Sequence, residues 1–196
     1  NRIMITHLNG ILAEKTPTHL IIECAGIGYF VKISLNSFSR ITTENGKNIK
    51  LFTHLQVKED SQTLYGFFAV QEREMFRHLI SVSGIGANTA MLMLSSLSSD
   101  EIANAITSDD VNLIKSVKGI GLKTAQRVIV DLKSKMAKIE FSAENIFSGN
   151  NTNKFEALTA LSTLGFDKTK AEKAINKVVT DDESVEDLIK AALKIL

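Results

Sequence analysis

The chain has 196 residues, of which 44% are hydrophobic and 23% charged, with 23 Lys and Arg against 22 Asp and Glu. This composition fits a globular protein of one or two domains and excludes a disordered chain. The single cysteine, Cys24, excludes a disulfide framework and a Cys-X-X-Cys zinc site, and without a signal-peptide pattern it predicts a reducing, cytoplasmic location. No apolar run is long enough for a membrane helix. We expect no cofactor, and we take Met4 as the start of the fold, leaving residues 1–3 outside it.

Residues 4–66 are predicted to form a β-domain. Short runs rich in β-branched and aromatic residues are separated by turn sequences such as Asn9-Gly10 and Glu44-Asn45-Gly46. About five strands are expected, in the runs IMITHL, HLIIEC, YFVKISL, NIKLFTHLQV and QTLYGF.

Residues 67–140 are predicted to be all-helical, because the apolar residues now recur with a helical period. Two further helix starts are expected near Ser99 and Ser108, where acidic residues follow in the first turn. The two clearest apolar stripes are Met75, Phe76, Leu79 and Ile80, and Ala125, Val128, Ile129, Leu132 and Met136.

Residues 141–153 are the predicted linker, because this segment has no sustained period and is rich in Ser, Thr and Asn. Residues 154–196 are predicted to form a bundle of three short helices. The first of these ends at Gly165, and Ser184 with Asp187 resembles a capping box that opens the third.

An internal repeat is the most informative feature of the helical region. The nonapeptides VSGIGANTA, from Val82 to Ala90, and VKGIGLKTA, from Val117 to Ala125, match at six of nine positions. Neither fits a dinucleotide-binding or ATPase phosphate loop, because a helical segment precedes each and the glycine spacing differs. Helix, Gly-Ile-Gly, helix instead predicts a hairpin whose second helix offers free amide groups to a phosphate.

Basic residues cluster next to the second copy of the repeat. Between Lys115 and Lys138 there are seven basic residues and one acid, Asp131. One copy alone would be equally typical of a plain helical turn, but two copies beside a basic helix predict binding to the DNA backbone without base readout.

Five segments of the chain resemble one known family over nearly the whole length. These segments are MITHLNG, FTHLQVKEDSQTLYGF, EREMFRHLISVSGIG, VKGIGLKTAQRVIVDLK and EALTALSTLGF. In this order and spacing they are similar to RuvA, the family of bacterial Holliday-junction recognition subunits. The resemblance implies an α+β multidomain fold with an oligonucleotide-binding (OB-fold) barrel, two helix-hairpin-helix motifs, a flexible linker and a mobile, UBA-like three-helix domain.

The same resemblance implies a non-catalytic protein that takes part in recombination and DNA repair. Four subunits would form a plate on a four-way junction, in some states doubled to an octamer. The partners implied are the RuvB ring ATPase, docked on the third domain, and the RuvC resolvase.

The expected DNA-binding residues lie in the two hairpins and in the turn between the last two predicted strands. In the first hairpin Asn88 departs from the family, which usually has a lysine there, so affinity is expected to depend more on the second hairpin. The full set is Lys58, Gly84, Gly86, Asn88, Lys118, Gly119, Gly121, Lys123, Thr124 and Arg127.

Glu59 and Asp60 lie between two predicted strands. From the residues alone they fit a solvated turn, or less well a metal-dependent nuclease site. The resemblance implies instead an acidic pin that repels phosphates at the junction centre.

In the last domain the resemblance implies an apolar face that receives the motor protein. Its expected residues are Leu161, Leu164, Phe166 and Leu193, and the alternative is that all four belong to the core of the bundle.

Two other classes of function remain open at this stage. A helix-hairpin-helix nuclease or glycosylase is the enzymatic alternative, although the four histidines are too widely spaced to predict a metal site. A pure protein-interaction scaffold is the other, and a lack of DNA binding at low salt would favour it.

Overall fold

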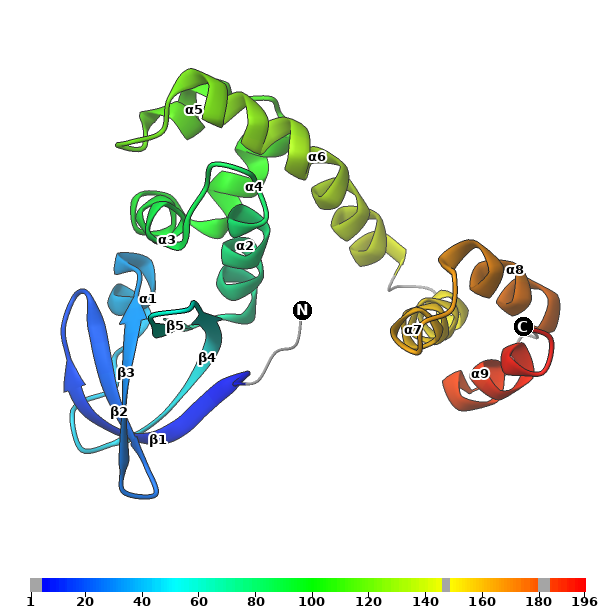
Figure 1. The fold of residues 1–196 in the computed structure, drawn as a ribbon, viewed down its shortest axis with the longest axis horizontal. Coiled ribbons are helices and arrows are strands. Elements are labelled where there is room, and N and C mark those ends of the chain that lie inside the picture. Colours follow the sequence, from blue (N-terminus) through cyan, green and yellow to red (C-terminus); the bar gives the residue numbers. More distant parts are fainter. Residues whose placement is uncertain (1–4, 146–148, 180–183) are drawn as a thin grey trace. The chain divides into compact units, whose positions relative to one another are not determined.

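The computed structural model describes residues 5–145, 149–179 and 184–196. Contacts divide the chain into two compact units, residues 1–136 and 137–196, with helix α6 passing from the first into the second. The first unit holds a barrel and a helical layer, and the second holds a small helical bundle (Figure 1).

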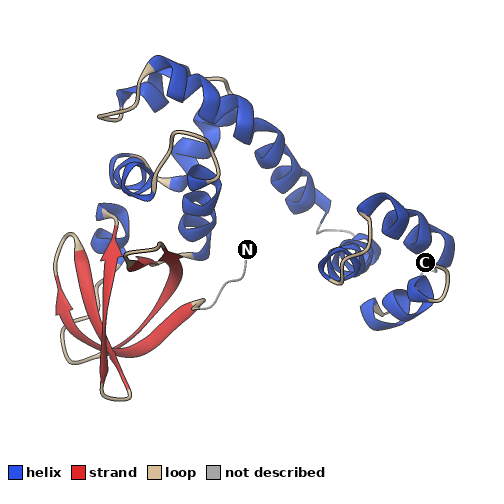
Figure 2. Ribbon diagram, in the orientation of Figure 1, coloured by secondary structure: helices blue, strands red, loops and turns tan. Residues whose placement is uncertain are grey.

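The first part of the chain forms a closed five-stranded barrel with the strand order β1-β2-β3-β5-β4. Neighbouring strands are antiparallel except β3 and β5, whose parallel pairing closes the barrel and leaves no free edge. Five strands are present as predicted, but the turn predicted at Asn9-Gly10 is wrong, because β1 continues through both residues, which pair with β4. The strands are β1 His7–Lys15, β2 His19–Cys24, β3 Ile27–Ile33, β4 Asn48–Val57 and β5 Gln62–Phe67 (Figure 2).

Alternation along the strands fills the barrel. Leu12 and Ile22 face each other in register on β1 and β2, and Leu20 pairs with Val31 on β2 and β3. All four side chains are fully buried, as period-two alternation requires for a strand with one face inward.

A short helix that the sequence analysis missed, α1 (Leu35–Arg40), follows β3. The run YFVKISL reads as one strand, but the strand ends at Ile33 because the side chain of Ser34 accepts a hydrogen bond from the backbone of Ser37 and caps the helix.

The helical layer of the first unit confirms the predicted apolar stripes. Met75, Phe76 and Leu79 are buried on one helix, and the apolar stripe of residues 125–136 is buried on another. The helix starts also lie close to their predicted places, with Ser98 and Asp110 as the N-caps of two helices. The bounds are α2 Val70–Ile80, α3 Ala87–Ser96, α4 Ser99–Thr107, α5 Val111–Ser116 and α6 Leu122–Asn145.

The linker predicted over 141–153 is helical wherever the structure describes it. Residues 141–145 belong to α6 and residues 149–153 to the next helix, whereas 146–148 lie outside the described residues. The flexibility of this segment stays a prediction.

The second unit contains the three predicted helices. They are α7 Gly149–Thr163, α8 Lys168–Val178 and α9 Val185–Leu193. Gly165 adopts a φ of 99° just after α7, and Ser184 caps α9 by accepting a hydrogen bond from the Asp187 amide. The core is built mainly from small and aliphatic side chains, namely Ala157, Leu161, Ala171, Ala174, Ile175, Leu188 and Ala192.

Candidate nucleic-acid interface

The two copies of the repeat have the same local geometry. The first links α2 to α3 and the second links α5 to α6. Val82 and Val117 accept hydrogen bonds from the amides of Ile85 and Ile120, at 3.0 and 3.1 Å. Because both isoleucines are buried, each turn is anchored in the core while its glycines stay exposed.

The first and second glycines of each hairpin differ in backbone conformation. Gly84 and Gly119 have φ values of 95° and 89°, which favour glycine strongly. Gly86 has a φ of −84°, and a Cβ added at Gly86 or Gly121 would meet no atom within 4 Å. Neither steric space nor backbone strain therefore requires a glycine at the second position.

That second position lies at the start of a helix whose amide groups are open. Gly86 is the N-cap of α3 and supplies no side-chain hydrogen bond to the first turn. The first amides of a helix lack intrahelical partners and carry the positive end of its dipole. A bare, exposed surface at this place suits the approach of an external anionic backbone.

The basic residues near the second hairpin fall into two groups. Lys118 and Lys123 are exposed and form no ion pair with any described residue. Lys133 forms an ion pair with Asp109, and Lys135 donates to the Ser81 hydroxyl at 3.0 Å. Part of the predicted basic run is thus engaged within the protein. Lys115 is exposed, and the side chain of another member, at position 138, lies outside the described residues.

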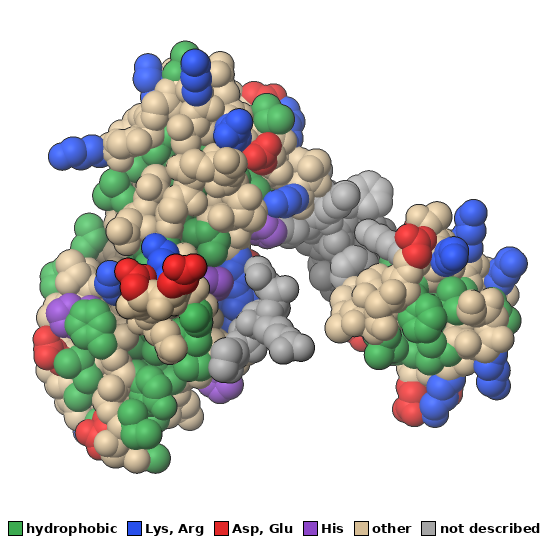
Figure 3. Space-filling model, viewed as in Figure 1, with side chains coloured by type: hydrophobic (Ala, Val, Ile, Leu, Met, Phe, Trp, Pro, Cys, Tyr) green, Lys and Arg blue, Asp and Glu red, His purple; other side chains and the backbone are tan. Residues whose placement is uncertain are grey.

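Arg127 connects the two hairpins. Its guanidinium reaches the carbonyl of Ser83 in the first hairpin at 3.5 Å, although Arg127 is on α6 of the second. The structure therefore brings the two copies side by side, with Asn88 exposed on one and Thr124 half-buried on the other. Lys and Arg side chains project from the end of the unit where α5 and the start of α6 lie (Figure 3).

The acidic turn joins β4 to β5, on the barrel. The amide of Lys58 donates to the Ser61 carbonyl at 2.8 Å and closes the turn, and the Ser61 hydroxyl donates to Asp60 at 3.2 Å. Lys58, Glu59 and Asp60 are all exposed, so the turn presents two carboxylates to solvent.

A cluster of cationic and imidazole side chains lies on α2 and the neighbouring β4. Glu74 forms ion pairs with Arg73 and Arg77 at 3.0 and 2.8 Å, yet two buried nitrogens of Arg77 have no hydrogen-bond partner among the described residues. Burial, and then the charges of Arg77 and Arg73, lower the pKa of His54. The sequence analysis did not identify this cluster, because its members are far apart in the chain.

One predicted docking residue is wrong. Leu161 is fully buried in the core of the second unit, because α7 turns this position toward α8 and α9. Leu164, Phe166 and Leu193 are exposed at 63%, 37% and 41%, and two further residues, Ile195 and Leu196, are exposed as well. Figure 3 shows hydrophobic side chains gathered on the visible face of this unit.

The described residues contain neither a metal-binding cluster nor a membrane-spanning helix. No three His, Cys, Asp or Glu side chains in this part of the chain are close enough to hold a metal ion. None of the helices in the same ranges is both long and apolar enough to cross a membrane.

Comparison with protein families matches almost the whole chain in three pieces. Residues 4–66 match the RuvA N-terminal domain, and residues 155–196 match the RuvA C-terminal domain. Between them, residues 76–134 match a SAM-like helix-hairpin-helix tandem, which covers both hairpins described above.

Curated relatives are similar over nearly their full length. A protein of Christiangramia forsetii is 54% identical over 193 residues, covering 97% of this chain and 99% of the relative. One of Flavobacterium psychrophilum is 52% identical with the same coverage, and one of Bacteroides thetaiotaomicron is 44% identical over 201 residues, covering 97% of this chain and 99% of the relative. Each is named Holliday junction branch migration complex subunit RuvA.

Proposed function

The chain belongs to the RuvA family, and on this premise we propose that it binds four-way (Holliday) junction DNA and recruits a RuvB ring ATPase for branch migration. The relatives' shared name supports the first part. The observation that carries it in this chain is the pair of exposed second glycines, Gly86 and Gly121. Neither steric space nor backbone strain requires them, and the absence of a side chain lets an external backbone approach closely.

The hairpins contact DNA through its backbone. Amides at the start of α3 and α6 donate to phosphate oxygens, and Lys118 and Lys123 add charge beside them. Contacts of this kind carry no base information, so binding is independent of sequence and falls steeply with salt.

The acidic turn supplies the preference for a junction. In a homotetramer on a four-way junction, Glu59 and Asp60 of each subunit face converging phosphates near the centre. Repulsion between like charges raises the energy of a continuous duplex there more than that of a splayed junction. The turn thereby disfavours the wrong DNA rather than attracting the right one.

A comparison of junction and duplex binding tests this part. In gel shifts at fixed salt, with the complex sized in parallel, the protein binds the junction more tightly and as a tetramer. Glu59→Gln with Asp60→Asn raises duplex affinity and lowers junction selectivity. Equal affinity of the unchanged protein for both DNAs would contradict the proposal.

The second unit recruits the motor through its exposed apolar side chains. Leu164 is the sharpest probe, because it is the most exposed of the predicted docking residues. Leu164→Ala costs less than about 1 kcal/mol of stability, whereas Leu161→Ala in the core costs about 2 to 5 kcal/mol. Leu164→Ala therefore lowers stimulation of the RuvB ATPase in a protein that melts normally.

Removing residues 154–196 separates the two activities. The shortened protein keeps junction binding, since both hairpins and the acidic turn lie in the first unit, and loses ATPase stimulation. Branch migration by the shortened protein, or loss of its junction binding, would refute this division.

A further inference from the structure

A buried polar joint connects the barrel to the helical layer. It consists of Ser34 and Ser37 at α1 and Glu72 on α2, with exposures of 0%, 0% and 4%. Both serine hydroxyls donate to the Glu72 carboxylate, that of Ser37 at 2.7 Å. The Ser37 oxygen also accepts from the amide of Phe68, the residue directly after β5, at 2.9 Å.

The same short helix also holds α3. The Asn36 amide group donates to the carbonyls of Leu94 and Leu97 at 2.7 and 2.9 Å, and the backbone of Leu35 donates to the Ser95 hydroxyl at 3.1 Å. Helix α1 therefore ties the barrel to α2, which enters the first hairpin, and to α3, which leaves it.

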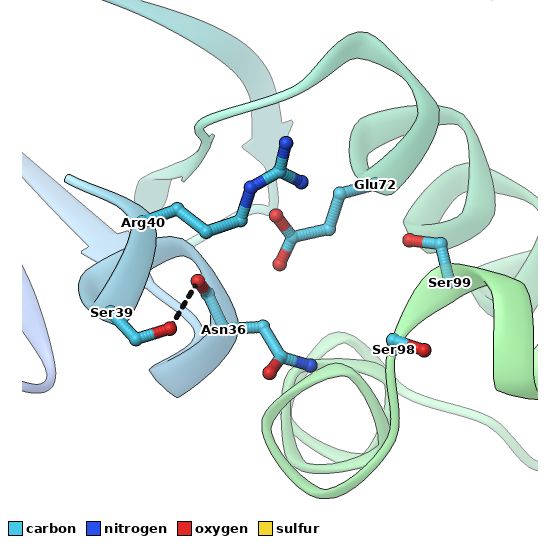
Figure 4. A pocket seen from close by; sticks show the side chains of 6 residues that line it. All are labelled: Asn36, Ser39, Arg40, Glu72, Ser98 and Ser99. Carbon is cyan, nitrogen blue, oxygen red and sulfur yellow. Dashed lines mark hydrogen bonds between the residues drawn. The ribbon is translucent and has the colours of Figure 1, made fainter.

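A pocket of about 130 Å³ opens beside the joint, between α1, α2 and the start of α4 (Figure 4). The Arg40 and Glu72 side chains point toward each other across it (Figure 4), but Arg40 forms no ion pair with any described residue and packs over the Phe68 ring at 4.9 Å. The remaining wall is formed by Asn36, Ser39, Ser98 and Ser99.

Stability alone does not account for a carboxylate at this place. Burial raises the pKa of Glu72, opposed by its two serine hydrogen bonds and by the charge of Arg40. An apolar residue of similar size often holds a core as well as a buried charge does. The hydrogen bonds fix the orientation of the barrel relative to α2, because a hydrogen bond is directional. The neighbouring contacts of Tyr65 and Phe67 with Phe76 are apolar and non-directional, so they do not fix this orientation by themselves.

Strand β5 connects the acidic turn to the joint, so the orientation of the barrel at the joint determines where the turn lies. The turn precedes β5, and the joint holds the residue that follows it. Six strand residues span about 17 Å, so a rotation of about 10° at the joint would displace the turn by about 3 Å.

We propose that Ser34, Ser37 and Glu72 are positioning residues that fix the acidic turn relative to the two hairpins and thereby set the preference for junction over duplex DNA. This inference rests on the proposed function. The hairpins bind the DNA backbone whatever the orientation of the barrel, so loosening the joint leaves junction binding intact. It relieves the repulsion of duplex DNA and thereby lowers selectivity.

The experiment compares two serines of α1 in the full-length protein. Ser37→Ala removes the hydroxyl that joins Glu72 to Phe68, whereas Ser39→Ala, the control, removes a hydroxyl that donates only to the Asn36 carbonyl and lines the same pocket. Ser37→Ala lowers the junction-to-duplex affinity ratio by about fivefold or more, because carboxylates repel the wrong DNA only when correctly placed. The change lies in duplex affinity, which rises, while junction affinity stays within about twofold, and Ser39→Ala behaves as the unchanged protein.

Glu72→Gln is a second variant that tests the same role if Ser37→Ala does not fold. It retains the size of the side chain and one acceptor oxygen, but it forces one serine to reverse its hydrogen bond. The ratio again falls while the melting temperature is maintained, a combination that a purely structural role does not produce.

The outcomes separate the two proposals. If the unchanged protein does not distinguish junction from duplex, the proposed function fails. If it does distinguish them and every folded variant of the joint keeps its ratio, or if Ser39→Ala lowers the ratio equally, the positioning role is overturned.

Discussion

In the first hairpin the turn is flanked by Ser83 and Asn88, whereas in the second Lys118 and Lys123 hold the corresponding positions. The backbones are nevertheless alike, with a left-handed first glycine, a buried isoleucine and a helix starting directly afterwards. Geometry has therefore been kept in both copies, while free charge is concentrated in one. The comparison teaches that backbone amides are the common element of the motif and that lysines are an addition to it.

The largest expected effect tests whether the two backbones are equivalent. Gly84→Val and Gly119→Val force a β-branched residue into a left-handed conformation, which costs about 1 to 3 kcal/mol of unfolding free energy. Gly86→Val and Gly121→Val cost less, about 1 kcal/mol or below, because each side chain enters open space and only the preference for glycine at a helix start is lost. Urea unfolding measures the free energy of unfolding of the four variants. Different losses at equivalent positions of the two hairpins would show that their backbones are not equivalent.

The next effect concerns DNA affinity and uses the two variants that the fold tolerates. Gly121→Val weakens junction binding about tenfold, equivalent to about 1.4 kcal/mol, because the side chain blocks a phosphate beside two free lysines. Gly86→Val weakens it by about threefold, since less charge supports that contact. Gel shifts on proteins with unchanged circular dichroism measure both, and normal binding by Gly121→Val would remove the second hairpin from the interface.

The repeat, the barrel and the apolar stripes could be predicted from the sequence because each has a strong local pattern. The short helix α1 could not, because its capping residue Ser34 ends an uninterrupted strand-like run and three-dimensional context decides where the strand stops. The helical backbone of the described part of 141–153 could not be predicted for a related reason, since a weak hydrophobic period does not prevent α6 and α7 from extending into this segment.

The outward or inward direction of a side chain was the hardest feature to predict. Leu161 and Leu164 lie one helical turn apart on the same apolar stripe, and only the placement of α8 and α9 decides that the first is buried and the second exposed. Glu72 likewise looks like an ordinary helix residue, because the serines that hold it are more than thirty positions away.

Adding a lysine to the first hairpin tests how much the charge difference between the two hairpins contributes to DNA binding. Asn88→Lys gives the first hairpin the charge that the second has, and it increases the salt slope of junction binding by about 0.9 per subunit of the bound tetramer in log–log form. Lys123→Asn, the matched control, decreases the slope by about the same amount. Titrations at four salt concentrations distinguish the two, and equal slopes for all three proteins would show that neither position lies near a phosphate.

The smallest expected effect concerns the contact between the helices that carry the hairpins. His78 is in the last turn of α2, and burial, followed by the charge of Lys135 on α6, lowers its pKa, with Glu74 opposing. Between this lowered value and 6.5 the unfolded chain binds more protons than the folded one, so stability falls as the pH decreases through that window and is constant below it. His54 acts in the same direction, and Glu72, whose pKa is raised, acts in the opposite one.

Because the three groups overlap, the contribution of His78 is measured as a difference between proteins. His78→Gln removes one titrating group at a half-buried position and leaves the other two in place. The melting temperature of the unchanged protein therefore decreases more between pH 7.5 and pH 5.5 than that of the variant, and the loss is accompanied by weaker protection of the Ser81 region, where Lys135 holds the first hairpin. Parallel melting curves over this range would show that protonation does not disturb the contact between α2 and α6, and the two hairpins would then behave as one rigid body at both pH values.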